Sequence, residues 1–252
     1  MYAHCLKNIL ILPRGFKESC SATQVAEAIK IGVAKSLPAA MIKAIPIADG
    51  GEDTAHILAQ QTQGKIIPKT ITGPLGQPIS SYFAMLGQPY QHVAVIEMAA
   101  AAGLKLIPLE QRNPMLTTSF GVGELIKAAL AEGATQIIVG CGDSGISDGG
   151  MGALQALGVN ITDQASQTVQ LGGQALQQVV QIDYSSLIAP LREHKVEIKL
   201  ALNPFNILCG PQGVAPVFGP QKGASPDQVQ QLSQGLEHWA KKKKKNHLNP
   251  IQ

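Results

Sequence analysis

The stretch IIVGCGDSGISDGG, residues 137–150, joins a short apolar run to a glycine-rich segment that also carries two aspartates. The apolar run predicts a buried strand, and the spacing of apolar residues over 151–159 predicts a helix after it. Glycines between a strand and a helix let backbone N–H groups approach a ligand closely. This order favours a loop that faces a ligand at the carboxyl end of a sheet; a simple tight turn is the alternative.

Strand and helix patterns alternate along the rest of the chain. Apolar runs predict strands at 8–13, 41–47, 135–140 and 195–205. Helical spacing predicts helices at 21–37, from about 52, at 118–133, at 151–159 and from 226. Between 66 and 98, turns containing Gly and Pro separate extended segments, which predicts β-hairpins. The alternation predicts an α/β protein in which the hairpins mark a second domain.

The composition argues against nucleic-acid binding. The chain has 252 residues, of which 45% are hydrophobic, so it can bury a substantial core. Its formal net charge is +3, but much of the excess comes from the lysine block at 241–245. Only 4% of the residues are aromatic, which leaves few groups for stacking on bases. A nearly neutral body with few aromatic residues is not typical of a protein that binds nucleic acids.

The cysteines and the N-terminus predict a cytoplasmic protein. The four cysteines are scattered without CxxC spacing, so they fit reduced thiols better than disulfides or zinc ligands. The apolar run near the N-terminus is shorter than the core of a signal peptide. No stretch of the sequence has the length and apolar character of a membrane span, so we expect no membrane association.

Two acidic loops carry candidate reactive carboxylates. Asp49 lies in ADGGED, and Asp143 and Asp148 lie in the glycine-rich loop. A carboxylate at the end of a strand can bind Mg²⁺ or abstract a proton from a hydroxyl group. The alternative is that these aspartates cap the helices that follow, as Glu52 and Asp53 also could at the helix dipole.

The glycine-rich loop also offers groups that can bind phosphate oxygens. The candidates are the serine hydroxyls and the glycine backbone, namely Gly142, Ser144, Gly149 and Gly150. The loop lacks the GxxxxGK[ST] spacing of a P-loop, and no GxGxxG with a downstream acid follows the first strand. Neither standard nucleotide fingerprint is therefore present.

Three cationic side chains lie in loops where they can meet an anion. Lys17 and Lys222 occur in PRGFKES and GPQKG, where an ammonium group can contact a phosphate or carboxylate. Arg112, in QRNPM, offers a guanidinium group with the geometry of a carboxylate partner. Solvated lysines and an arginine paired with a nearby acid are the ordinary alternatives.

Six motifs, in their order and approximate spacing, resemble those of the bacterial glycerate kinase family, the group that is unrelated to P-loop kinases. The motifs are IPIADGGEDT, TGPLGQP, VIEMAAAAGLKLIP, QRNPMLTTSFGVGELIKAAL, IIVGCGDSGISDGGMGALQALG and VFGPQKGASPDQV. The resemblance extends from about residue 7 to about residue 240. Six ordered motifs make it far more specific than any single site.

The resemblance implies a kinase that uses ATP and Mg²⁺ to phosphorylate D-glycerate, with 2-phosphoglycerate as the favoured product, in glyoxylate metabolism. It also implies a Rossmann-like domain that is interrupted by a second α/β domain, with the active site between them. On this basis residues 1–66 form part of the first domain, which is incomplete here. Residues 67–235 form the second domain, and residues 236–252 form a lysine-rich tail.

Roles for individual residues follow from chemistry at the matching motif positions. We expect Asp49, Asp148 and Lys17 to be catalytic, with the two aspartates also holding the magnesium ion. We expect Arg112 and Lys222 to bind the substrate or phosphate, together with the loop groups named above.

Two loops depart from the family pattern. The first loop of the family usually resembles APDSFKGSLSA, whereas this chain has LPRGFKESCSA, so Arg14 and Gly15 stand where an acid and a hydroxyl are common. A carboxylate role at position 14 is therefore out of reach. The later loop commonly reads GGSATNDGG and here reads GDSGISDGG.

The C-terminal region departs further. Family members continue well beyond the GPQKGA helix, whereas this chain passes from LEHWA into KKKKKNHLNPIQ, a pattern that suggests reading-frame slippage. An incomplete sheet would favour association with another chain, as a homo-oligomer or with a complementing chain. An inactive truncated fragment that at most binds ligand or another chain is therefore the alternative to an active kinase. A metal-dependent phosphate-ester hydrolase is a third hypothesis.

Overall fold

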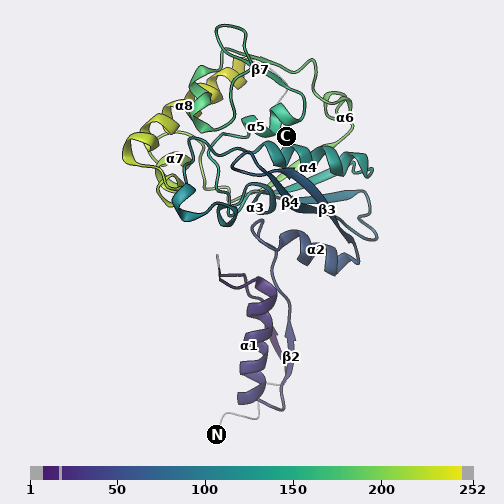
Figure 1. The fold of residues 1–252 in the computed structure, drawn as a ribbon. Helices are drawn as coiled ribbons and strands as arrows, with labels where there is room; N and C mark the ends of the chain where they lie inside the picture. Colours follow the sequence, from purple (N-terminus) through teal and green to yellow (C-terminus); the bar gives the residue numbers. More distant parts are fainter. Residues whose placement is uncertain (1–7, 17–18, 246–252) are drawn as a thin grey trace.

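The computed structural model describes residues 8–16 and 19–245 of the chain. Figure 1 shows a small unit that projects from a larger α/β body. This unit, called the N-terminal lobe here, consists of β1 (Asn8–Ile11), α1 (Ala22–Ser36) and β2 (Met41–Ala44). The predicted α/β class is confirmed, and Lys17 and residues 246–252 of the predicted tail lie outside the described residues.

The N-terminal lobe is a parallel strand pair with one helix packed on it. β1 and β2 pair in parallel, with Ile9 opposite Ile42. Ser21 is the N-cap of α1, because its hydroxyl accepts a hydrogen bond from the Gln24 N–H while the Gln24 side chain accepts one from the Ser21 N–H. This reciprocal capping satisfies backbone donors that the first helical turn leaves unpaired.

A five-stranded mixed sheet forms the centre of the body. Its strands, in spatial order, are β3 (Lys65–Thr72), β4 (Pro78–Met85), β5 (Val93–Glu97), β6 (Gln136–Gly140) and β9 (Glu197–Ala201). β3, β4 and β5 are antiparallel neighbours, which confirms the predicted hairpins. β5, β6 and β9 are parallel, so their carboxyl ends meet at one edge of the sheet.

Helices cover both faces of the central strand β5, as its sequence requires. β5 is buried along its whole length because Val93 and Val95 pack with α2 (Thr54–Thr62), whereas Ala94 and Ile96 pack with α4 (Phe120–Ala131). The short helix α3 (Met98–Ala102) follows β5 directly. Burial on both faces explains why β5 reads as a nearly continuous apolar run.

A second core lies under the C-terminal helix. The elements around it are α5 (Met151–Ala156), β7 (Asn160–Thr162), η3 (Gly173–Gln178), β8 (Gln181–Asp183), α7 (Val214–Phe218) and α8 (Pro226–Lys245). The short helix α6 (Ala189–Arg192) instead packs Leu191 against the core of the central sheet. α8 buries Leu232, Leu236 and Trp239 against the second core and then runs on through the lysine block. The tail predicted from residue 236 thus begins inside α8, and the three domain boundaries stay predictions. Among the described residues, no helix combines the length and hydropathy that crossing a membrane requires.

Close packing between α4 and α5 generates a stability prediction. A Cβ atom at Gly123 in α4 would lie 2.3 Å from the Ala153 carbonyl oxygen. Gly123→Ala should therefore lower the free energy of unfolding by about 1–3 kcal/mol through overpacking. The control is Gly32→Ala in α1, where nothing lies within 4 Å and where alanine should instead stabilise by about 0.5–1 kcal/mol. Urea unfolding followed by circular dichroism measures both, and a neutral Gly123→Ala would contradict the packing.

Candidate active site

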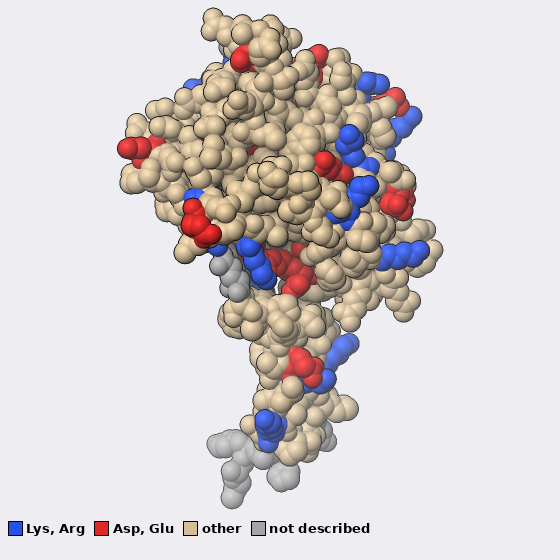
Figure 2. All heavy atoms as spheres, viewed as in Figure 1, with Lys and Arg blue, Asp and Glu red and all other residues tan. Residues whose placement is uncertain are grey.

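The candidate site lies where the loops after the parallel strands meet the N-terminal lobe. The glycine-rich loop after β6 contacts the ADGGED loop through a hydrogen bond from the Gly142 N–H to the Gly50 carbonyl oxygen, 2.9 Å long. On its other side the loop contacts the segment after α3, where the Leu104 N–H donates to the Asp143 carbonyl oxygen at 2.9 Å. Both signs of charge gather where the lobe joins the body in Figure 2.

Two glycines in these loops are required by backbone packing. A Cβ atom at Gly140 would lie 2.6 Å from the Gly50 carbonyl oxygen. One at Gly142 would lie 2.7 Å from the Gly51 Cα atom. Gly142, expected to bind phosphate, therefore serves loop-to-loop contact in this structure, and its N–H is already bonded to Gly50.

A cavity of ≈ 190 Å³ opens beside this contact. It is lined by Glu52, Leu104, Lys105, Arg112, Asp143, Ser144 and Gln221. Of the residues singled out from the sequence, the cavity brings together Arg112, Ser144 and Asp143, and it also includes Glu52, which was considered as a helix cap. No sequence pattern assigns Lys105 and Gln221 to a site. Lys105 lies inside one of the six motifs, but its neighbours in the sequence are apolar, so no local pattern of polar residues indicates a binding role.

Lys222 holds the glycine-rich loop beside the cavity through hydrogen bonds. Its side chain is buried, and Nζ donates to the Ile146 carbonyl oxygen at 2.6 Å and to Ser144 Oγ at 3.2 Å. Lys222 ends the short helix η4 (Pro220–Lys222), which lies close to Arg112 because a Cβ atom at Gly223 would be 2.1 Å from the Arg112 carbonyl oxygen. The loop, Lys222 and Arg112 are therefore one packed unit.

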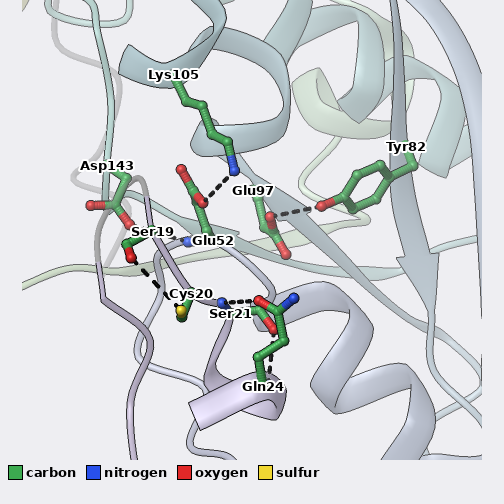
Figure 3. A network of polar contacts seen from close by, with 9 residues as sticks. All are labelled: Ser19, Cys20, Ser21, Gln24, Glu52, Tyr82, Glu97, Lys105 and Asp143. Atoms are coloured by element: carbon green, nitrogen blue, oxygen red, sulfur yellow. Dashed lines mark hydrogen bonds and ion pairs between the residues drawn. The ribbon is translucent and has the colours of Figure 1, made fainter.

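Opposite charges pair across the cavity. Lys105 Nζ lies 3.6 Å from Glu52 Oε2, and the Glu52 N–H donates to Asp143 Oδ2 at 3.2 Å. Figure 3 shows Lys105 and Glu52 pointing toward each other, with Asp143 close to Glu52. Carboxylates and cations at one small cavity can bind and orient a polar, anionic ligand.

Asp49 lies outside the lining of this cavity. Arg14 Nη1 lies 3.3 Å from Asp49 Oδ2, and the two side chains are 70% and 39% exposed, respectively. Asp49 Oδ1 also accepts the Gly51 N–H at 3.1 Å. The arginine that departs from the family pattern thus forms an ion pair with the aspartate that was expected to react.

Asp148 is fully buried at the junction of α4 and α5. Oδ2 accepts hydrogen bonds from the N–H and hydroxyl groups of Ser119, at 2.7 and 2.8 Å, and from the Gly152 N–H at 3.3 Å. Oδ1 accepts the Gly150 N–H at 3.1 Å. These contacts fit the alternative in which the aspartate caps helices, because they satisfy donors at the starts of α4 and α5.

Gly149 and Gly150 adopt backbone angles that favour glycine. Their φ angles are 59° and 78°, in the left-handed region. The Gly149 carbonyl oxygen accepts a hydrogen bond from Trp239 Nε1 at 3.0 Å, so this turn is fixed against α8. Among the described residues, the lining of the cavity includes neither glycine.

The two predicted metal ligands do not fit a shared magnesium ion in this arrangement. The Asp148 oxygens already accept hydrogen bonds from backbone and hydroxyl donors, and Asp49 is paired with Arg14. Within the described part of the chain, no group of three or more His, Cys, Asp or Glu side chains is arranged to hold a metal ion.

Glu97 is a buried acid that the sequence did not single out. It ends β5, is 1% exposed, and its Oε1 accepts the Ala55 N–H at 2.6 Å while Oε2 accepts the Tyr82 hydroxyl at 3.2 Å (Figure 3). Glu97 therefore caps α2, whereas Asp53, at the N-cap position, makes no side-chain cap hydrogen bond. Burial raises the pKa of Glu97 to about 7, the two hydrogen bonds oppose the rise, and the charges of Asp53 and Glu52 add to it.

Replacing Asp148 tests whether its hydrogen bonds hold the two helices together. Asn at this position keeps only one acceptor oxygen and turns an amide toward backbone donors, so Asp148→Asn should lower the free energy of unfolding by about 2 kcal/mol or more. The control is Asp163→Asn in an exposed turn, where Oδ1 accepts the Ala165 and Gln167 N–H groups and Asn can do the same. Equal stability of the two variants in urea unfolding would refute the capping role.

The raised pKa of Glu97 predicts a pH dependence of stability. The folded protein binds the proton of the Glu97 carboxyl group more tightly than the unfolded chain does. The contribution of this group to the free energy of unfolding is therefore fully present below pH 4.5 and is lost as pH rises through about 7. The loss is about 3 kcal/mol for this shift. Glu97→Gln keeps an acceptor without the charge, so it should be more stable than the wild type at pH 8 and similar at pH 4.

Urea unfolding between pH 4 and pH 8 measures this difference. Glu237→Gln, at an exposed position on α8, is the matched control and should follow the wild type at every pH. A Glu97→Gln variant with the wild-type pH profile would show that Glu97 does not titrate as its burial requires.

Comparisons with known proteins bear on the whole chain. Residues 9–251 match the glycerate kinase family. The chain is 47% identical over 232 residues to "Glycerate kinase" of Bacillus subtilis, covering 92% of this chain and 60% of that protein. It is 42% identical over 237 residues to "Glycerate 2-kinase" of Escherichia coli, covering 94% of this chain and 61% of that protein.

A solved structure gives the same result. A crystal structure of a candidate glycerate kinase 2 from Salmonella typhimurium LT2 superposes with a TM-score of 0.79 at 40% identity, covering 93% of this chain and 63% of that chain. The chain thus spans about 60% of the length of the curated relatives it matches. With this match over nearly its whole length, the chain belongs to the glycerate kinase family.

Proposed function

We propose that this chain phosphorylates D-glycerate at the cavity beside the glycine-rich loop, with ATP as phosphoryl donor and Mg²⁺ as cofactor. The observation that carries the proposal is the convergence of Arg112, Lys105 and Ser144 on one small cavity in a member of the glycerate kinase family. The name of the Escherichia coli relative, glycerate 2-kinase, supports 2-phosphoglycerate as the product.

The cations at the cavity suit the substrate's carboxylate. Glycerate is a small hydroxy acid, and Arg112 provides a planar guanidinium group that can bind a carboxylate through two parallel hydrogen bonds. Lys105 adds a second positive charge on the same lining. Binding the carboxylate would fix the orientation of the hydroxyl groups, which is most of what a phosphoryl-transfer site must do.

The acids of the cavity are placed to act on a substrate hydroxyl. Glu52 and Asp143 line the cavity and lie at its junction with the ADGGED loop. We assign to one of them the acceptance of the hydroxyl proton during transfer, by chemistry. Asp49, Asp148 and Lys17 as catalytic groups stay predictions, and Asp148 fits a positioning role because it ties the starts of α4 and α5.

The phosphoryl group would lie near Ser144 and Lys222. ATP, when bound, supplies this group. The buried Lys222 ammonium is hydrogen-bonded to the Ser144 hydroxyl, so it can keep this hydroxyl in place while negative charge develops on the phosphoryl group during transfer. Magnesium dependence, location in the cytoplasm and a place in glyoxylate metabolism belong to the same proposal. An inactive fragment that at most binds ligand or another chain is the alternative.

An assay of ADP release with D-glycerate, ATP and Mg²⁺ tests the proposed reaction. Arg112→Lys keeps the charge but loses the paired hydrogen bonds, so the KM for glycerate should rise about tenfold or more. Arg192→Lys is the matched control, because Arg192 is exposed and donates to the Ser185 carbonyl oxygen, away from the cavity. Omitting Mg²⁺ should abolish turnover.

Two results would count against the proposal. Absence of glycerate-dependent ADP release from the folded chain would show that it is not an active kinase by itself. An unchanged KM in Arg112→Lys, with turnover intact, would move the carboxylate site away from Arg112.

A further inference from the structure

A second cavity, of ≈ 470 Å³, lies beside the first. Its lining includes Leu75, Glu110, Arg112, Asn113, Leu116 and Gln228. Arg112 lines both cavities, so this one side chain stands at their boundary. Sites that hold a small molecule commonly enclose roughly 300–1,000 Å³. The first cavity, at ≈ 190 Å³, suits a compact acid such as glycerate, and the second has room for a larger ligand.

Two leucines from neighbouring segments give the second cavity its apolar surface. Leu75 lies in the turn between β3 and β4, and Leu116 lies in the segment that leads to α4. The Thr118 N–H donates to the Pro74 carbonyl oxygen at 3.0 Å, which holds the turn against this segment. The two leucines are 37% and 54% exposed although they line one cavity. Apolar side chains left open in a cavity are suited to contact the faces of a planar ring.

A pair of hydrogen-bonded amides fixes the orientation of Asn113. Its Oδ1 accepts the Met115 N–H at 3.1 Å and Gln228 Nε2 at 3.3 Å. Gln228 is itself held in place, because its Oε1 accepts the Ser225 N–H at 2.9 Å. The acceptor oxygen of Asn113 is therefore used within the protein, whereas its Nδ2 group makes no hydrogen bond to the described residues. A donor of fixed orientation thus remains for a ligand.

The segment before Asn113 adds an acid and a cation. Glu110 lies in the short helix η2 (Leu109–Gln111), which leads directly into Arg112. The Glu110 side chain is exposed, and within the described part of the chain its carboxylate makes no ion pair or hydrogen bond. Carboxylates bind ribose hydroxyls in nucleotide sites, and a guanidinium group pairs with phosphate oxygens. One short segment therefore carries suitable partners for a ribose and for a phosphate.

We propose that the second cavity binds the nucleoside part of ATP. The base would lie between Leu75 and Leu116, and Nδ2 of Asn113 would donate to a ring nitrogen of the base. The Glu110 carboxylate would accept hydrogen bonds from the ribose hydroxyls. The inference rests on the proposed function, because it assigns a place to the phosphoryl donor of that reaction.

Arg112 would then lie between the phosphoryl donor and the acceptor. It is the residue common to both cavities, and Ser144 belongs to the lining of the first. Phosphates that extend from the second cavity past Arg112 would therefore reach the glycine-rich loop. A guanidinium group at this boundary can stabilise the charge of the phosphoryl group during transfer.

Titration calorimetry of the full chain with ADP and Mg²⁺, without glycerate, tests the apolar part of the site. Leu116→Ala removes a contact with the base and should weaken ADP binding by about fivefold or more. Leu109→Ala is the matched control, because Leu109 is 77% exposed and lies outside the described lining of both cavities. This control should bind ADP as the wild type does.

Asn113→Asp tests the polar contact with the base. The aspartate keeps an acceptor oxygen for Met115 and Gln228 but replaces the amino group by a second oxygen, so ADP binding should weaken by about tenfold or more. Asn160→Asp, at an exposed position in β7, is the matched control and should leave ADP binding unchanged. In the assay of ADP release, Asn113→Asp should raise the KM for ATP and leave the KM for D-glycerate as it is.

Three results would overturn the inference. ADP binding that Leu116→Ala and Asn113→Asp leave at the wild-type affinity would place the nucleotide elsewhere. A higher KM for D-glycerate, rather than for ATP, in Asn113→Asp would assign the second cavity to the acid substrate. The third is the absence of ADP binding to the folded chain. Circular dichroism of each variant separates lost binding from lost folding.

The two measurements separate this inference from the proposed reaction. Glycerate-dependent ADP release by a chain in which both variants keep the wild-type affinity for ADP would support the reaction and overturn the site. ADP binding that both variants weaken, without glycerate-dependent turnover, would support the site and count against the reaction.

Discussion

Contact between two loop backbones is the constraint on which the site depends. The glycine-rich loop after β6 and the ADGGED loop lie so close that neither Gly140 nor Gly142 has room for a side chain. One loop belongs to the body and the other leads out of the lobe, so their contact joins the two parts of the molecule. The cavity with Arg112 and Ser144 opens beside this contact.

Buried charged side chains hold these loops and the neighbouring helices in place. Asp148 satisfies donors at the starts of α4 and α5, Glu97 does the same for α2, and Lys222 binds the carbonyl oxygen of Ile146. Each of these charged groups is buried and hydrogen-bonded, which is the condition under which burial of charge is tolerated. The site therefore combines partly exposed polar groups that line the cavity with buried charged groups that hold the surrounding loops and helices.

The architecture could be predicted from the sequence to a large extent, because periodicity and turn residues act locally. The hairpins of β3, β4 and β5, the strand and loop around residues 137–150, and the capping by Ser21 all follow such local rules. The role of a carboxylate is different, because it depends on partners distant in the chain. Asp148 reads as a reactive acid until Ser119 is seen to donate to it, and Glu97 reads as one more residue of an apolar strand until Ala55 and Tyr82 are placed around it.

The hydrogen bond from Trp239 to the Gly149 carbonyl oxygen gives the protein an internal reporter. Trp239 is the single tryptophan of the sequence, and it is buried against the turn that follows Asp148. Indole emission depends on the polarity around the ring and on its hydrogen bond. The tryptophan emission of the unlabelled chain, excited at a wavelength that tyrosine does not absorb, therefore arises from one position beside the glycine-rich loop, so a ligand that changes the surroundings of this ring can be followed without an added dye.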